Sequence, residues 1–360
     1  MATRRGFEPP ISTVTGWHVR PLHHRAVCAQ TRFYRIPTPP GQMTLAAPRC
    51  PSPSPEPREG LSPSPRKESG LGVRFPTTTH RHPPHAPPRY TPPVMPGAAF
   101  TPRILTTRGL DLPYLVAGNG PLIVLSYILG PSVWGNLDAL ATQCTVAVID
   151  PRPLSAEQLL AVGRYDWLPL LARDLGFESA ALATWSLGAP SALRYAATRP
   201  AALAGLVLVD PAGVSPAPWY LRWRLGRPFS GGPGVSPGLE EIRHLVSRQW
   251  RGWVHDPSLD TSQLQADHVA LLTKPGMFDA NARGNAAAAT STLFDAFADV
   301  EAPVLLLTGR HSRVLGPAAA RRLAARLPRA RLVLFDASAH ALHLEQPSLF
   351  VQTLAEFLTS

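Results

Sequence analysis

The sequence contains little cysteine, almost no lysine and no long hydrophobic run. Its three cysteines, Cys28, Cys50 and Cys144, form neither a disulfide framework nor the spacing of a metal site, which favours a reducing compartment. No apolar stretch approaches the roughly 20 residues that a membrane-spanning helix requires, and no secretory signal is recognisable. We therefore expect a cytoplasmic protein without a membrane span, with an N-terminal targeting peptide left open.

The sequence also lacks a glycine-rich phosphate-binding loop, an internal repeat and a cluster of metal-ligating side chains. No cofactor and no metal is implied, and the oligomeric state is not indicated.

Proline and positive charge are concentrated in the first hundred residues. They hold thirteen Lys and Arg against four Asp and Glu, so most of the formal net charge of +11 lies there. Residues 1–99 are therefore predicted to be disordered, and we expect no nucleic-acid binding by the remaining domain. The tail has three interpretations: a surface for acidic partners, a targeting peptide, or, as we favour, residues upstream of a true start at Met43 or Met95.

Residues 101–360 alternate short apolar runs with longer helical patterns, which is typical of a parallel sheet wrapped by helices. We predict a doubly wound α/β fold with a mostly parallel eight-stranded sheet and helices on both faces. The predicted strands are 103–107, 112–117, 122–126, 145–150, 180–185, 206–210, 303–308 and 331–335. The predicted helices are 132–141, 167–175, 187–197, 317–327 and 347–358.

Ser186 lies where an apolar run passes through small residues into a helical pattern, in the string 181–189. A strand-to-helix corner of this kind exposes a serine hydroxyl at the carboxyl edge of a sheet, in the pattern G-x-S-x-G. Thr184 occupies the first glycine position, which weakens the match. The motif alone is weak.

Four further strings, 118–125, 204–213, 302–309 and 339–347, accompany the string 181–189 along residues 101–360. In their order and spacing these strings resemble the α/β-hydrolase fold proteins, specifically the capped serine-hydrolase type. The elbow Trp185-Ser186-Leu187-Gly188 is similar to that of the pimeloyl-carrier methyl esterases. Trp185 is also readable as a pocket-lining aromatic without diagnostic value, and this is the interpretation that we favour.

The resemblance implies roles for individual residues. Ser186 would be the nucleophile and His340 its general base, although His340 is also readable as a surface histidine that starts the final helix. His343 would be a packing or hydrogen-bonding residue. The family's acid position after the seventh strand is Ser312, so Asp210, at the end of the preceding strand, is the substitute acid; an ordinary strand-end aspartate is the alternative.

The oxyanion loop also departs from the family. The resemblance implies the backbone N–H groups of Leu187 and Ile128 as oxyanion donors, but Ser126-Tyr127 stands where the family has His-Gly. Tyr127 and Trp185 are predicted to line the pocket. In the turn 150–153 proline replaces a glycine, which indicates a rebuilt loop.

About ninety residues separate the sixth and seventh predicted strands, far more than an ordinary connection needs. We predict a helical cap over residues 211–297 and a hydrolase core of residues 100–210 and 298–360. Stretches near 239–253 and 264–273 are predicted cap helices, and the Trp/Arg string 219–224 fits a lid helix better than base stacking.

The sequence predicts a carboxylesterase-type serine hydrolase that acts on a small or medium ester. The alternative is a protein that keeps the fold, has lost the reaction and serves as a binding or interaction module. Labelling by a fluorophosphonate distinguishes the two.

Overall fold

The computed structural model describes residues 100–107, 109–214, 237–290 and 297–360. The predicted disordered tail (1–99) and the string 219–224 lie outside these residues, so both predictions stay untested.

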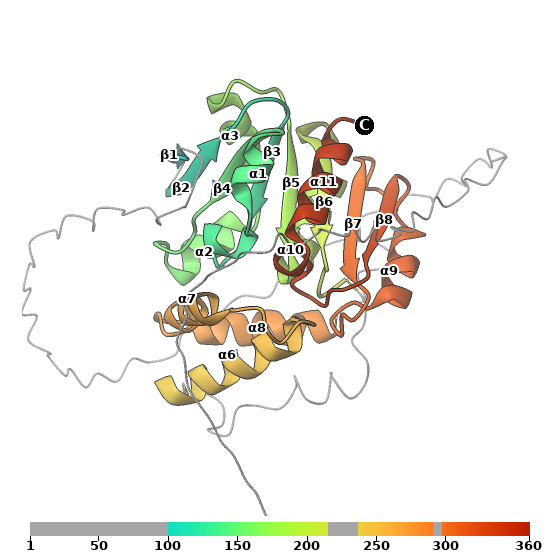
Figure 1. Cartoon of the computed structure of the whole chain (residues 1–360). Helices are drawn as coiled ribbons and strands as arrows, with labels where there is room; N and C mark the ends of the chain where they lie inside the picture. The colour runs from blue at the N-terminus through green and yellow to red at the C-terminus, as the bar shows by residue number, and fades with distance from the viewer. Residues whose placement is uncertain (1–99, 108, 215–236, 291–296) are drawn as a thin grey trace, which may run out of the picture.

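An eight-stranded sheet forms the centre of the molecule (Figure 1), in the order β1-β2-β4-β3-β5-β6-β7-β8. The strands are β1 (Thr101–Thr107), β2 (Leu110–Ala117), β3 (Leu122–Ser126), β4 (Thr145–Ile149), β5 (Ala180–Trp185), β6 (Leu203–Val209), β7 (Val304–Gly309) and β8 (Ala330–Phe335). From β4 to β8 every neighbouring pair is parallel, whereas β1, β2 and β4 pair antiparallel. The prediction of a mostly parallel eight-stranded sheet is confirmed.

Helices cover both faces of this sheet. The helices between the strands or after them are α1 (Leu137–Ala141), α2 (Ala156–Val162), α3 (Leu168–Asp174), α4 (Ala189–Thr198), α9 (Pro317–Ala324), α10 (Leu342–Glu345) and α11 (Pro347–Leu358), with 3-10 turns η1 (Pro131–Trp134), η2 (Ser186–Gly188) and η3 (Pro200–Ala202). Buried residues of α2, α3, α4 and α9 join one hydrophobic cluster, and those of α1 and α11 join the other. The predicted doubly wound arrangement is therefore confirmed (Figure 1).

The central strands are apolar throughout because both of their faces are buried. In β5, Ala180 and Leu182 pack into the first cluster, whereas Ala181, Ala183 and Trp185 pack into the second. This alternation aims Trp185 toward the face that α1 and α11 cover. Thr184 points to the opposite face, where the hydroxyl of Tyr165 hydrogen-bonds to its Oγ1 at 3.5 Å.

Three helices lie between β6 and β7 in the chain: α6 (Leu239–Trp253), α7 (Ser262–Leu272) and α8 (Met277–Thr290). We call them the inserted helices. They gather together beyond one end of the strands (Figure 1). Asp267 of α7 accepts a hydrogen bond from Ser132 of η1 at 2.9 Å, and α8 contacts η2. They therefore lie over the loops that follow β3 and β5.

Candidate active site

Ser186 lies directly after β5, at the turn into α4. Its φ of 52° falls in the left-handed region, which costs energy for a residue with a side chain and is found where a sharp turn must expose a group. A Cβ on Gly188 would lie 1.9 Å from Thr184 Oγ1, so a larger residue there would force the Thr184 side chain to move. The N–H of Ala212 donates to the carbonyl of Ser186 at 3.0 Å, which ties this turn to the loop after β6.

Asp210 lies directly after β6, next to the serine turn. Trp185 and Val209 are paired in register, so the residues that follow them, Ser186 and Asp210, emerge at the same level of the sheet edge. Asp210 also has a positive φ, 37°, and its N–H donates to the carbonyl of Leu307 in β7 at 2.7 Å.

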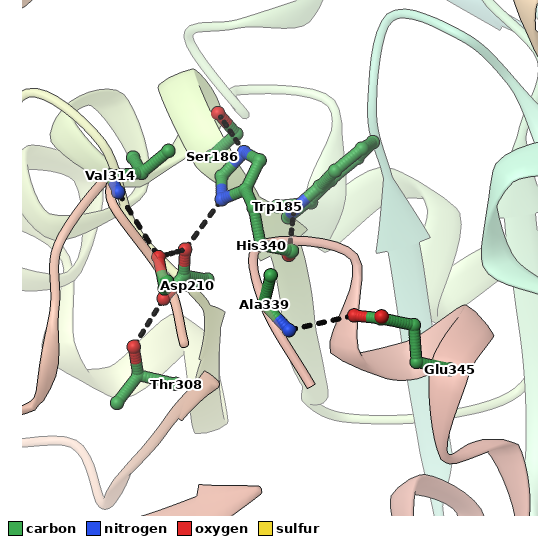
Figure 2. Close-up of polar contacts among 9 residues, drawn as sticks. Trp185, Ser186, Asp210, Thr308, Val314, Ala339, His340 and Glu345 are labelled. Carbon is green, nitrogen blue, oxygen red and sulfur yellow. Dashed lines mark hydrogen bonds and ion pairs between the residues drawn. The ribbon is translucent and has the colours of Figure 1, made fainter. Parts of the chain in front are cut away.

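His340 lies between these two side chains (Figure 2). Its Nε2 is 3.0 Å from Ser186 Oγ, and its Nδ1 is 2.5 Å from Asp210 Oδ2. An imidazole with its proton on Nδ1 donates to Asp210 and leaves Nε2 to accept from the serine hydroxyl. His340 is 1% exposed and Asp210 is 0% exposed, so the interpretation of His340 as a surface histidine is wrong.

Two buried hydroxyls also contact the Asp210 carboxylate. Ser312 donates to Oδ2 at 2.6 Å, and Thr308 of β7 donates to Oδ1 (Figure 2). Ser312 Oγ in turn accepts the N–H of Val314 at 3.1 Å. Asp210 thus accepts hydrogen bonds from His340, Ser312 and Thr308, which suits an ionised carboxylate because it has only acceptor sites.

The predicted oxyanion donors follow two neighbouring strands. Ser126 at the end of β3 is paired with Thr184 of β5, so the loop that contains Ile128 leaves the sheet beside the serine turn that contains Leu187. The N–H of Gly130 donates to the carbonyl of Tyr127 at 3.0 Å, which closes this loop.

The rebuilt turn after β4 supports the same loop. Arg152 and Asp150 form a bidentate ion pair, with Nε–Oδ1 and Nη2–Oδ2 distances of 2.7 and 2.8 Å. A Cβ on Gly130 would lie 2.8 Å from the Arg152 Nε and 2.9 Å from Asp150 Oδ1. With its φ of 76°, Gly130 therefore allows the loop after β3 to pack directly on this pair.

Aromatic rings surround the imidazole of His340. The ring of Trp185 lies 5.0 Å from it, and the indole N–H of Trp185 donates to the His340 carbonyl at 3.0 Å (Figure 2). The ring centroid of Trp253 in α6 lies 5.2 Å from that of the same imidazole, and the ring centroids of Tyr127 and Trp185 are 4.8 Å apart. Burial raises the pKa of Tyr127, which a hydrogen bond with the Ser186 side chain partly offsets, so its hydroxyl stays protonated.

Two further histidines are buried near this site. Burial, with a smaller contribution from the charge of His340, lowers the pKa of His343 to about 3. Burial lowers the pKa of His268 on α7 to about 4, and its ring stacks on Trp253 at 5.8 Å. Both are therefore neutral near pH 7. His343 packs against Trp134, Trp185 and Phe350.

The segment that carries His340 is bonded to the inserted helices. Glu345 accepts the N–H of Ala339 at 2.7 Å with one oxygen (Figure 2), and the N–H groups of His255 and Asp256 with the other. The N–H of Ala341 donates to the carbonyl of Trp253 at 2.9 Å. These bonds hold the loop after α6 against the histidine segment.

Within the described parts of the chain, no three His, Cys, Asp or Glu side chains are grouped as metal ligands. Among the helices that the structure describes, none has the length and apolar character to cross a membrane.

Sequence reasoning missed several contributors to this site. Ser312 was considered only as a missing carboxylate, and Thr308, Trp253 and Glu345 were not singled out. Two local signals were available: the predicted strand 303–308 ends in a threonine, and a glutamate follows His340 by five positions. Neither signal predicts which group the side chain contacts.

Comparison with known proteins finds similarity to hydrolases. The sequence model of the family described as serine aminopeptidase, S33, matches residues 173–347. The chain is 29% identical over 256 residues to a protein of Pseudomonas savastanoi named as a carbamate hydrolase, RutD. This alignment covers 67% of this chain and 95% of the relative. It is 27% identical over 249 residues to a pimeloyl-[acyl-carrier protein] methyl ester esterase of Nitrosomonas europaea, over 65% of this chain and 94% of the relative.

Solved structures show the same fold. A hydrolase of Pseudomonas aeruginosa aligns with a TM-score of 0.56 at 22% identity, over 73% of this chain and all (100%) of that one. An enol-lactonase of Burkholderia xenovorans aligns with a TM-score of 0.53 at 22% identity, over 72% and 100% of the two chains.

Proposed function

We propose that this chain, which belongs to the α/β-hydrolase superfamily, is a serine hydrolase that cleaves a small or medium carboxylic ester through an acyl-enzyme on Ser186. The matched family model and the relatives named as hydrolases make it a hydrolase. They favour an enzyme over the alternative of a binding module. The ester as substrate is our inference, supported by the esterase among those relatives.

One observation carries the proposal: the continuous hydrogen-bonded chain from Ser186 Oγ through His340 to Asp210. A serine hydroxyl is a poor nucleophile until a base removes its proton. His340 Nε2 lies within reach of that proton, and Asp210 holds the imidazole in the required tautomer and stabilises its positive charge.

The reaction then has two halves. Ser186 Oγ attacks the ester carbonyl carbon while its proton moves to His340 Nε2, and the N–H groups of Leu187 and Ile128 bind the oxyanion. The intermediate collapses by breaking the bond to the alcohol oxygen, which leaves with the proton from Nε2. Water then attacks the acyl-enzyme, gives one proton to Nε2, and releases the carboxylic acid as Ser186 Oγ regains that proton.

The aromatic surroundings support the same chemistry. Trp185 and Trp253 cover the imidazole, which limits the access of water to the charge that forms on it. In this environment the attraction between the imidazolium and Asp210 is stronger than in water.

Steady-state hydrolysis of p-nitrophenyl acetate, butyrate and octanoate tests the proposal. We expect turnover by the wild type, a loss of kcat of at least about 10³-fold in Ser186→Ala and in His340→Ala, and wild-type rates in the control Ser348→Ala, which removes an exposed serine hydroxyl from α11. Wild-type rates in Ser186→Ala, or no hydrolysis of any ester by the wild type, would refute the proposal.

A further inference from the structure

Ser312 occupies a specific place in the hydrogen-bond network behind the imidazole. It follows β7 by three residues and is 8% exposed. Its Oγ accepts the N–H of Val314 at 3.1 Å, and it lies 2.6 Å from Asp210 Oδ2. Because a backbone N–H already uses a lone pair of this oxygen, the hydroxyl proton is directed at the carboxylate.

The two hydroxyls that contact Asp210 are not equivalent. Thr308 donates to Oδ1, the oxygen that is turned away from the imidazole. Ser312 donates to Oδ2, the same oxygen that accepts from His340 Nδ1 at 2.5 Å. Only Ser312 therefore competes directly with the imidazole for the negative charge of one oxygen.

We propose that Ser312 is a positioning residue that fixes the Asp210 carboxylate against His340 and, by sharing Oδ2, limits how strongly that carboxylate stabilises a protonated imidazole. This inference rests on the proposed function and concerns a residue at which a carboxylate, not a hydroxyl, was expected.

The two effects have different consequences. Fixing the carboxylate keeps His340 oriented toward Ser186, so loss of the Ser312 hydroxyl lowers kcat. Sharing Oδ2 draws charge away from the imidazole, so loss of the hydroxyl leaves more charge on Oδ2 and makes the protonated imidazole more stable. The pH at which the imidazole loses its proton then rises, whereas a purely structural loss of packing would not move it in a defined direction.

The groups around His340 make this titration interpretable. Among the described residues in contact with its ring, Asp210 carries the charge and Ser186, Trp185 and Trp253 are neutral. His343 is the neighbouring titratable group, and burial keeps it neutral over the range in which an enzyme of this kind is assayed.

The test compares the wild type with Ser312→Ala, Ser312→Thr and Thr353→Val. Thr353→Val is the matched control because it removes another buried hydroxyl, which among the described residues donates to the Leu349 carbonyl in α11, away from Asp210. Two quantities are measured: the proton resonance of His340 Nδ1–H by NMR as a function of pH, and the pH profile of kcat/KM on the best p-nitrophenyl ester.

In Ser312→Ala we expect kcat to fall about tenfold with KM unchanged, as for the loss of one hydrogen bond to a charged group. We also expect the midpoint of the His340 titration and of the acid limb of kcat/KM to move to higher pH. Ser312→Thr, which keeps the hydroxyl, restores both, and Thr353→Val changes neither. If Ser312→Ala does not fold, Ser312→Cys, with a weak S–H donor, is expected to shift the midpoint in the same direction.

An unchanged midpoint in Ser312→Ala or Ser312→Cys, or a shift to lower pH, would overturn the inference. The NMR titration does not require turnover. An inactive wild type with the predicted shift would therefore refute the proposed function alone, whereas an active wild type without the shift would refute only the role of Ser312.

Discussion

Replacement of Asp210 by asparagine removes one negative charge from behind His340 and keeps the size of the side chain. The asparagine amide can place either its oxygen or its nitrogen beside His340 Nδ1. With the nitrogen there, Nδ1 must accept, so the ring proton moves to Nε2 and the imidazole can no longer take the serine proton. With the oxygen there, the tautomer survives but the charge is lost.

The structure allows the size of this effect to be worked out. Asp210 is fully buried, and its Oδ2 lies 2.5 Å from His340 Nδ1. Unit charges about 4 Å apart at an effective dielectric constant of about 20 attract by about 4 kcal/mol, which corresponds to about 10³-fold in rate. The tautomer effect adds to this, so we expect kcat/KM for Asp210→Asn to fall by about three to four orders of magnitude.

The assay is ester hydrolysis at a fixed pH near 8, with circular dichroism to establish that the variant is folded. Most of the loss should be in kcat, because Asp210 is fully buried behind the imidazole. A folded Asp210→Asn protein with kcat/KM within about tenfold of the wild type would refute the assignment of Asp210 as the acid.

Three further predictions concern the surroundings of the site. A methyl group on Gly188 would lie 1.9 Å from Thr184 Oγ1, so urea unfolding should show Gly188→Ala to be less stable by about 1–3 kcal/mol; if the clash is the cause, Gly188→Ala with Thr184→Ala is more stable than Gly188→Ala alone. Glu345→Ala removes the carboxylate that joins Ala339 to the loop after α6, and we expect kcat to fall about tenfold with a smaller loss in Glu345→Gln; equal rates in all three proteins would contradict this. Burial lowers the pKa of His343 from 6.5 to about 3, so the unfolded state binds more protons below pH 6.5 and the free energy of unfolding falls from there toward pH 3. Between pH 6.5 and pH 5 the free energy of unfolding of His343→Phe should therefore fall by about 1.6 kcal/mol less than that of the wild type in urea titrations, and a parallel decline of both proteins would disprove this origin.

The bounds of some elements were predictable from local pattern. β3, β5 and α11 begin and end at the residues predicted, because each is a continuous apolar run or a clear helical period between turn residues. The strand expected at 206–210 begins earlier, at Leu203, and ends at Val209. The stretch 132–141 was predicted as one helix, but the structure divides it into η1 and α1, with Gly135 at a φ of 57° between them.

Other elements required knowledge of what they pack against. Helix α2 was not predicted, because its sequence is short and Val162 is its only buried residue. Its capping box, in which Ser155 and Gln158 exchange hydrogen bonds with each other's backbone N–H, was nevertheless readable from the sequence. The inserted helices α6 and α7 were predicted near 239–253 and 264–273, whereas α8 was not singled out.

The site likewise combines a feature that the local sequence predicts with contacts that it does not predict. The turn at Ser186 was readable because strand, small residues and helix follow each other directly in the chain. The contacts of Asp210 with His340 and Ser312 join residues separated by 130 and 102 positions. No local pattern specifies such pairs, and the parallel pairing of β6 with β7 and of β7 with β8 brings together the loops that carry them. The catalytic roles of Ser186, His340, Asp210, Leu187 and Ile128 stay predictions.

Reaction with a fluorophosphonate, followed by intact-mass and peptide mass spectrometry, tests the central claim most directly. An activated serine should form one covalent adduct per chain, on the peptide that contains Ser186, and this adduct should be lost in Ser186→Ala and form far more slowly in His340→Ala. No adduct on the folded wild-type protein, or an adduct on another residue, would contradict the claim that His340 activates Ser186.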